Sequence, residues 1–328
     1  MIKEFISGYR EKTYEKMNKA EEKILEMKGV ILYNELSRER GTVTIDDNSF
    51  KEMAFFQKLQ FLKRILPNLR RCRNIQSKSV ESLIENPGHP KTIADKAFIA
   101  SLEKEAKLMG VNAVGYVKVP RGSIFKNRGI LYENAIILTM EMDKEKIGKA
   151  PSFDTMDNVI KTYADLGEMA NEIASSLRKN GYGAHASPAL GGLVFYPALA
   201  EKAGMGVRGR HGLLISPGCG PRQRIAAVFT SIENLPVSAD NSHEWIRDFC
   251  KNCGRCIKKC PPGAIYETPV KMANEEIRFV DGEKCLQYFS KNYGCSVCIK
   301  ECPFNTVGYD NIKAGHDRKN RASSKDKT

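Results

Sequence analysis

Residues 250–261 read CKNCGRCIKKCP, and residues 295–303 read CSVCIKECP. Both runs consist of closely spaced cysteines and end in Cys-Pro, and one isolated cysteine, Cys285, lies between them. In the first run, three thiolates at two-residue intervals can bind one [4Fe-4S] cluster, while the fourth, before the proline, reaches a second cluster. The eight cysteines therefore predict one module that holds two [4Fe-4S] clusters.

The crossed pattern assigns four cysteines to each cluster. The expected ligands are Cys250, Cys253, Cys256 and Cys302 for one cluster, and Cys260, Cys285, Cys295 and Cys298 for the other. Zinc is an alternative, because C-x2-C pairs also build tetrahedral zinc sites. Three thiolates at this spacing, however, supply more sulfur in one loop than a structural zinc site needs. A disulfide framework is disfavoured, since a chain of 328 residues is long enough for an ordinary core.

The composition is that of a globular chain with two domains, or with one domain and a small module. It has 328 residues, 41% hydrophobic content and a formal net charge of +13. The first eight residues include Lys3 and Glu4 and form no apolar leader. No stretch approaches the roughly 18 consecutive apolar residues that a membrane span requires. We therefore expect a cytoplasmic protein without a membrane partner.

The positive charge is concentrated in two windows that contain no acidic residue. The first lies between Glu52 and Glu81, and the second runs from Lys202 to Ile232. Such a window forms either a solvated basic face or a site for an anionic partner. Nucleic acid is an admissible partner for the first window, although the sequence does not favour it. The second window is rich in glycine and lies among apolar residues.

Apolar periodicity divides the chain into four regions. We expect a helical, basic N-terminal region at 1–88, a core of mixed strands and helices at 89–240, the cluster module at 241–310 and a basic disordered tail at 311–328. The expected helices cover 2–27, 50–66, 92–109 and 156–179, and the expected strands cover 113–119, 135–140, 213–216 and 225–230. The second helix should stop at Pro67, and Gly110 should cap the third. The predicted fold class is α+β.

One glycine motif resembles a dinucleotide fingerprint but lacks the required context. Gly204, Gly206 and Gly209 have the G-x-G-x-x-G spacing. A predicted helix at 197–203 precedes them where a strand is needed, and no acidic residue follows until Glu233. The sequence also contains no G-x-x-x-x-G-K-[ST] phosphate loop. We therefore do not expect a nucleotide site here.

Residues 203–215 read AGMGVRGRHGLLI. The pattern A-G-x-G-x-x-G-[KR]-H-x-L-L-I, followed by a late cysteine run with one isolated upstream cysteine, resembles the cobalamin-dependent iron–sulfur reductases. These include epoxyqueuosine reductase and the catalytic part of reductive dehalogenases. The resemblance covers about residues 92–305 and depends on both motifs in this order.

The resemblance implies a nitroreductase-like α/β core that holds a corrinoid, with a bacterial-ferredoxin-like module packed against it. An external donor such as a ferredoxin or flavodoxin would reduce the clusters, and the corrinoid would reduce an electrophilic small molecule. The expected cofactor contacts are Gly204, Gly206, Gly209, Arg210, His211 and Gly212. Glycine lets the backbone approach a flat macrocycle closely. A tight turn between a helix and a strand would need glycine as well.

The chain departs from both groups of relatives at the proton donor. Epoxyqueuosine reductases use an acidic residue, and an ungapped register puts Leu190 at that position. Reductive dehalogenases use a tyrosine, for which Tyr196 is our catalytic candidate and Tyr182 the alternative. Either tyrosine can instead be an ordinary packed aromatic. The helical repeats with which some epoxyqueuosine reductases grip tRNA are also missing.

Three functions agree with these features. The first is a corrinoid-dependent iron–sulfur reductase whose substrate is not epoxyqueuosine. The second is an electron-transfer protein whose core binds no cofactor of its own. The third is a divergent tRNA epoxyqueuosine reductase, which the first basic window motivates.

Overall fold

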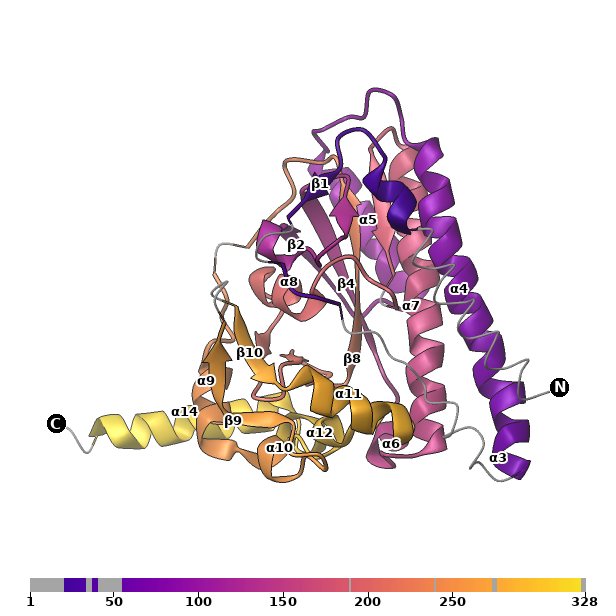
Figure 1. The fold of residues 1–328 in the computed structure, drawn as a ribbon. Helices are drawn as coiled ribbons and strands as arrows, with labels where there is room; N and C mark the ends of the chain where they lie inside the picture. Colours follow the sequence, from indigo (N-terminus) through magenta and orange to yellow (C-terminus); the bar gives the residue numbers. More distant parts are fainter. Residues whose placement is uncertain are drawn as a thin grey trace.

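The computed structural model describes residues 21–33, 37–40, 55–188, 190–238, 240–272 and 276–325. A four-stranded sheet with helices on both faces forms the core, and the cysteine-rich module lies at one end of it (Figure 1). Most of the helix predicted over 2–27 lies outside the described residues, as does the start of the helix predicted over 50–66. The fold mixes helices and sheet as expected, while the nitroreductase-like label for the core remains a prediction.

The sheet has the strand order β2-β4-β8-β5, and each neighbouring pair is antiparallel. Its strands are β2 (Ala113–Lys118), β4 (Asn134–Glu141), β8 (Gln223–Thr230) and β5 (Ala184–Ser187). Side chains alternate between the two faces of a strand. Ile136 and Leu138 of β4 therefore join one buried layer, while Ala135 and Ile137 join the other. Burial on both faces explains why these strands read as continuous apolar runs.

Helices cover both faces of this sheet. Helices α5 (Lys96–Met109) and α7 (Phe153–Lys179) pack on one face, and α8 (Tyr196–Lys202) packs on the other. The Ser152 hydroxyl begins α7 by accepting the Thr155 N–H at 3.2 Å. Gly110, at φ 104°, ends α5 in the left-handed conformation that the sequence predicts. Predicted helices and strands therefore match this part of the fold, apart from β5, which the sequence did not indicate.

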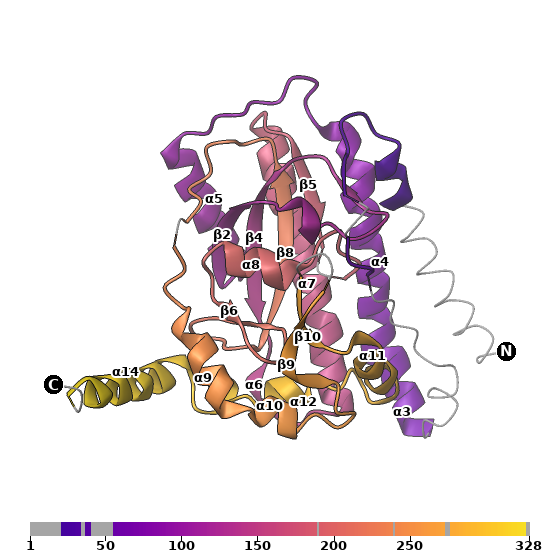
Figure 2. The same cartoon turned by 60° about the vertical axis from the view of Figure 1, so that its left-hand side comes forward.

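Short elements complete the core. They are β1 (Ile31–Leu32), η2 (Ser82–Glu85), η3 (Arg121–Ser123), β3 (Gly129–Ile130), α6 (Lys144–Gly148), β6 (Val207–Arg208) and β7 (Leu214–Ile215). The pairs β1–β3 and β6–β7 are antiparallel. The β6–β7 pair holds the glycine-rich segment in a tight reversal beside the cysteine-rich module (Figure 2).

The prediction that Pro67 stops a helix is wrong. The chain runs from α3 (Phe55–Gln60) through the π-helical turn η1 (Phe61–Ile65) into α4 (Leu66–Glu81), with Pro67 in the first turn of α4. A proline has no N–H and clashes with the preceding turn of a regular helix. The wider turn immediately before Pro67 accommodates this defect. Buried Phe61 and Ile65 then pack with α7 residues, so tertiary contacts stabilise the continuous helix.

The described part of the first basic window lies on α3, η1 and α4, and several of its side chains pair with acidic side chains of α7. Arg71 donates to Asp165 at 2.9 Å and to Glu168 at 2.7 Å. Arg64 likewise donates to Asp157 at 2.6 Å. Part of this basic charge is therefore paired within the protein, in a contact at the surface between neighbouring helical segments. The window does not need an anionic partner to explain it.

The cysteine-rich module consists of short helices and one hairpin. Its elements are α9 (Trp245–Cys253), α10 (Arg255–Lys258), β9 (Ile265–Lys271), β10 (Ile277–Val280), α11 (Gly282–Lys291), α12 (Val297–Lys300) and α13 (Pro303–Thr306). Strands β9 and β10 pair in an antiparallel manner. Figures 1 and 2 show the module below the lower end of the sheet, next to α6 and α7.

The chain continues into helix α14 (Tyr309–Lys325), where we expected a disordered tail. That expectation is wrong for these residues. Tyr309 and Ile312 are buried against Phe304 and Trp245, and the Tyr309 hydroxyl lies 2.6 Å from Nδ1 of His243. Two apolar anchors at the start of the segment thus order a helix whose later residues are mostly polar. Of the helices within the described ranges, none combines the length and apolarity needed to span a membrane.

Candidate metal centre

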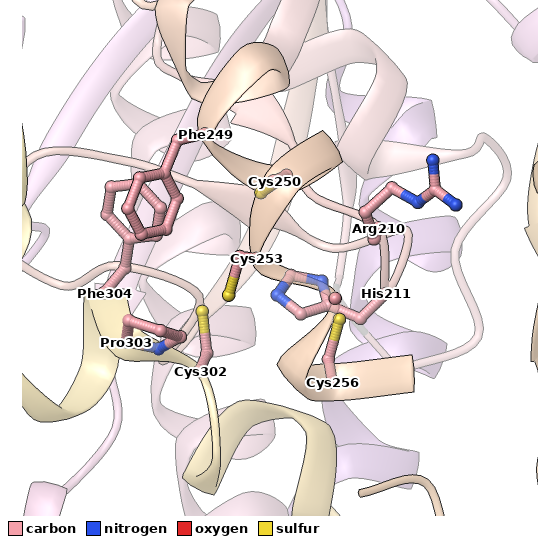
Figure 3. A pocket seen from close by; sticks show the side chains of 10 residues that line it. Arg210, His211, Phe249, Cys250, Cys253, Cys256, Cys302, Pro303 and Phe304 are labelled. Carbon is pink, nitrogen blue, oxygen red and sulfur yellow. The ribbon is translucent and has the colours of Figure 1, made fainter. Parts of the chain in front are cut away.

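Four of the predicted ligands line one pocket. They are Cys250, Cys253, Cys256 and Cys302, and Figure 3 shows three of their sulfurs directed toward the same space. Cys250 and Cys253 lie in the last turn of α9, and Cys256 lies in α10. Gly254, at φ 59°, reverses the chain between these helices, a conformation that favours glycine. Cys302 approaches from the end of the module, just before α13.

The other four predicted ligands form a second group. Burial raises the pKa of the Cys285 thiol, and the nearby Cys295 and Cys260 raise this pKa further. Burial likewise raises the pKa of Cys298, and the nearby Cys285, Cys295 and Cys260 add to this rise. Cys285 lies on α11 and Cys298 on α12. The backbone between these helices is unusual, because Cys295 (φ 39°) and Ser296 (φ 65°) are left-handed. The structure therefore brings the eight cysteines together in the same two sets of four that the crossed pattern assigns.

The two groups adjoin each other at Cys256 and Cys298, where Cys256 lies close enough to raise the pKa of the Cys298 thiol. They differ in exposure, because Cys256 and Cys302 of the first group are buried and its Cys250 and Cys253 are partly exposed, while every cysteine of the second group is partly exposed. In the described part of the chain, no three His, Cys, Asp or Glu side chains are gathered closely enough to hold a single metal ion. Because the first group contains the two buried cysteines, we call it the inner group, and we call the second the outer group.

Backbone N–H groups surround these sulfurs. Ala264 N–H donates to Sγ of Cys260 at 3.3 Å. Burial raises the pKa of Cys302 to about 12, and hydrogen bonds from the backbone of Phe304 and Asn305 oppose this rise. Such donors stabilise negative charge on sulfur, as a bound iron–sulfur cluster requires. Four thiols per group with N–H donors aimed at them fit a [4Fe-4S] cluster.

The glycine-rich segment touches the inner group. Arg210 and His211 line the same pocket as Cys250, Cys253, Cys256 and Cys302. The Arg210 backbone N–H forms a hydrogen bond with Cys250, whereas the Arg210 side chain points away from the sulfurs in Figure 3. The imidazole of His211 points in among them. The segment expected to contact a corrinoid therefore also forms one wall of the inner cysteine site.

The glycines of this segment have a role within the protein itself. A Cβ atom on Gly206 would lie 2.1 Å from the Ile215 carbonyl oxygen, and one on Gly209 would lie 2.6 Å from Ile215 Cδ1. Gly204 and Gly212 have positive φ angles of 73° and 75°. These observations favour the alternative reading, in which the turn between α8 and β7 needs glycine. Contact of these glycines with a corrinoid remains a prediction.

The two candidate tyrosines are held in structural contacts. Tyr196 is 9% exposed, and its hydroxyl donates to the carbonyl oxygen of Ser187 at 2.8 Å. Tyr182 is also buried, packs on Phe98 with ring centroids 5.0 Å apart, and donates to the Ile93 carbonyl at 3.3 Å. Both hydroxyl groups thus anchor neighbouring loops. A catalytic role for Tyr196 remains a prediction, and this setting does not favour it.

The sequence analysis did not single out a third tyrosine, Tyr163. Tyr163 of α7 is partly exposed, and the Arg224 guanidinium lies 4.3 Å from its ring centroid. Arg224 Nη1 also donates to the Tyr163 hydroxyl at 3.3 Å. Tyr163 packs against the same buried cluster as Cys298 of the outer group, and it joins Leu190 around a second cluster. In the sequence it was one of several apolar positions on a helix stripe, and only its contact with β8 distinguishes it.

Fold and site together define a protein with an iron–sulfur module packed against a mixed helix-and-sheet core. Residues 249–306 match the family model described as a 4Fe-4S dicluster domain. The chain is 34% identical over 212 residues to a tetrachloroethene reductive dehalogenase of Desulfitobacterium hafniense. It is 31% identical over 124 residues to an epoxyqueuosine reductase of Francisella cf. novicida (strain Fx1). Homologues of this chain are therefore reductive dehalogenases and epoxyqueuosine reductases, which supports the resemblance seen in residues 203–215.

These matches cover parts of the proteins. The dehalogenase alignment spans 60% of this chain and 37% of the relative, and the epoxyqueuosine reductase alignment spans 33% of this chain and 31% of the relative. Among solved structures, the catabolic reductive dehalogenase NpRdhA superposes with a TM-score of 0.66 at 21% identity, over 84% of this chain and 43% of that chain. The chain thus has the fold of part of that enzyme and spans well under half the length of these relatives.

Proposed function

We propose that the protein is a corrinoid-dependent iron–sulfur reductase that acts on an electrophilic small molecule. The observation that carries the proposal is the shared inner pocket, in which Arg210 and His211 of the core meet four cysteines of the module. Such a contact suits a protein whose module delivers electrons into its own core. The relatives whose names are printed as reductive dehalogenases and epoxyqueuosine reductases support a reductase.

The corrinoid part of the proposal is supported by relatives and by unsatisfied polar atoms. One solved reductive dehalogenase with a TM-score of 0.64 is described in connection with B12-dependent dehalogenation. In this chain, Arg210 Nε, Gln223 Oε1 and Arg224 Nε are buried and have no hydrogen-bond partner among the described residues. A buried polar group normally has a partner. These three side chains, near the junction of core and module, would hold the amide and phosphate groups of a corrinoid.

A bound corrinoid would supply a strongly reducing centre that amino-acid side chains lack. The chain's own residues would supply a proton and hold its donor in place. We assign the proton to the Tyr163 hydroxyl, because Tyr163 is partly exposed and Tyr196 is buried. The positive guanidinium of Arg224, which contacts the Tyr163 hydroxyl, would stabilise the phenolate left after proton donation.

Electrons would enter at the outer cysteine group. Its members Cys260, Cys285, Cys295 and Cys298 are all partly exposed. The external donor, such as a ferredoxin or flavodoxin, remains a proposal. A role in tRNA modification is not favoured, because Arg64, Arg71 and Lys78 of the basic window that motivated it are paired with acidic residues of α7.

The experiment is anaerobic reconstitution of the chain with iron, sulfide and cobalamin, followed by assay with reduced methyl viologen as electron donor. Suitable test substrates are tetrachloroethene and 3-bromo-4-hydroxybenzoic acid, which are named with the relatives. We expect substrate reduction only when both the clusters and the corrinoid are bound. A protein that assembles both clusters but never retains cobalamin would instead be an electron-transfer protein.

A further inference from the structure

The imidazole of His211 lies in the inner cysteine site, and one of its two ring nitrogens forms no hydrogen bond with the described residues. His211 is 4% exposed and lines the pocket with Cys250, Cys253, Cys256 and Cys302. Its Nε2 atom is buried and has no hydrogen-bond partner among the described residues. Figure 3 shows the ring extending between Cys253 and Cys256. An unpartnered polar atom aimed into a site points to a group that binds there.

The other ring nitrogen fixes which atom carries the proton. Nδ1 of His211 accepts the Leu213 backbone N–H at 3.1 Å. A nitrogen that accepts a hydrogen bond has no proton, so a neutral imidazole in this position carries its proton on Nε2. The ring therefore presents an N–H donor toward the sulfurs.

The backbone on either side of the ring makes this orientation stable. Gly209 leaves space for the ring, because a Cβ atom there would lie 3.0 Å from His211 Cε1. The Gly209 N–H donates to the Leu213 carbonyl at 2.9 Å and closes the turn that carries His211. This turn and the bond to Leu213 hold the imidazole in one position before any cluster is bound.

We propose that His211 Nε2–H donates a hydrogen bond to a sulfur of the [4Fe-4S] cluster held by Cys250, Cys253, Cys256 and Cys302. Reduction adds negative charge to the cluster, and a donor to sulfur stabilises that charge. The bond therefore raises the reduction potential of the inner cluster relative to the outer one and favours electron flow inward. His211 acts here as a positioning and tuning residue, and no proton is transferred.

This proposal depends on the clusters and not on the corrinoid. The test uses cobalamin-free, cluster-loaded full-length protein in a redox titration followed by electron paramagnetic resonance. In His211→Leu, we expect one cluster to lose about tenfold in its ratio of reduced to oxidised form at a fixed potential, which is about 59 mV for a one-electron couple. The other cluster should keep its potential. His211→Gln, which retains an N–H donor near the same place, should recover most of the shift.

His185 offers a matched control. It is 1% exposed, lies on β5 and also has an unpartnered ring nitrogen among the described residues, but it packs against Phe229 of the sheet rather than against cysteines. His185→Leu should therefore leave both cluster potentials unchanged. A shift of equal size in both histidine variants would show a general effect of core packing and would overturn the proposal.

A second measurement needs no variant. Wild-type protein labelled with ¹⁵N-histidine should show hyperfine coupling from one histidine nitrogen to one reduced cluster in pulsed electron paramagnetic resonance. This measurement decides the matter if His211→Leu fails to assemble its inner cluster. Absence of the coupling, or an unchanged potential in an assembled His211→Leu protein, overturns the proposal. Failure to bind cobalamin would not affect either readout, so the two proposals fail separately.

Discussion

Nη1 of Arg222 donates a hydrogen bond to Oδ1 of Asn305 at 2.6 Å, and this bond joins the core to the cysteine-rich module. Arg222 directly precedes β8, and Asn305 lies in α13, three residues after Cys302. Arg222 Nε also donates to the Met142 carbonyl at 2.9 Å. The side chain is buried and thereby links the edge of the inner cysteine site to the end of the sheet.

Removal of this link should destabilise the protein strongly. Arg222→Met leaves Asn305 and the Met142 carbonyl without their buried donor, so we expect the free energy of unfolding to fall by about 3 kcal/mol. Arg222→Lys, which keeps the charge but loses the fork geometry, should cost less. Anaerobic denaturant titration of the cluster-loaded protein measures both values. A loss below about 1 kcal/mol in Arg222→Met would contradict the structural role given to this residue.

The matched control is an arginine whose ion pairs lie nearer the surface. Arg71 and its partner Glu168 have side chains that are 36% and 49% exposed. Exposed pairs contribute little, because solvent screens them. Arg71→Ala should therefore lower the free energy of unfolding by about 1 kcal/mol or less in the same titration.

The crossed ligand pattern predicts which cysteines share a cluster. Cys302→Ser and Cys253→Ser should perturb the same electron paramagnetic resonance signal, although the two residues belong to different cysteine runs. Cys298→Ser should perturb the other signal, despite its position only four residues before Cys302. The comparison of the three reduced spectra is the measurement. If Cys298→Ser and Cys302→Ser alter the same cluster, the crossed assignment is wrong.

Two variants distinguish Tyr163 from Tyr196 as the proton donor. Tyr163→Phe should reduce kcat by about 10²-fold to 10⁴-fold while cluster content stays unchanged, because a positioned proton donor contributes that much. Tyr196→Phe should act mainly on stability, since its hydroxyl anchors the Ser187 carbonyl. Steady-state rates with the substrates used for reconstitution provide the comparison. A larger kcat loss in Tyr196→Phe than in Tyr163→Phe would restore Tyr196 as the donor.

The buried His185 predicts a pH dependence of stability. Burial lowers its pKa from 6.5 to about 3. Below pH 6.5 the unfolded chain therefore binds a proton that the folded protein does not, and the free energy of unfolding falls as the pH falls toward 3. Between pH 7 and pH 5 this single group should account for a loss of about 2 kcal/mol. Denaturant titrations at both pH values should show that His185→Leu lacks this part of the decline, and equal declines in both proteins would contradict it.

The cysteine module was the part of the molecule most open to prediction from sequence. Ligand spacing is local, so the intervals from Cys250 to Cys260 already imply the geometry that the structure shows. Helix ends that depend on one residue were equally accessible, as the left-handed Gly110 illustrates. In these cases short-range covalent geometry determines the outcome.

Features that depend on tertiary contacts could not be predicted in this way. Tyr163 and Arg224 are 61 residues apart in sequence, and nothing in either neighbourhood marks them as a pair. Pro67 was expected to end a helix, but a π-helical turn and packing against α7 allow the helix to continue. Tyr309 was overlooked because the polar residues after it dominate the composition of the segment. In each case a distant partner overrides the local signal.

The measurement that tests the central claim most directly is cobalamin retention by the reconstituted protein. After anaerobic assembly of the clusters and removal of unbound corrinoid, we expect about one cobalamin per chain and a base-off Co(II) signal in the electron paramagnetic resonance spectrum. Arg224→Met, which removes an unpartnered buried donor, should weaken retention while both cluster signals persist. If fully assembled protein retains no cobalamin and shows no Co(II) signal, the core is not a corrinoid site and the proposed reductase function is wrong.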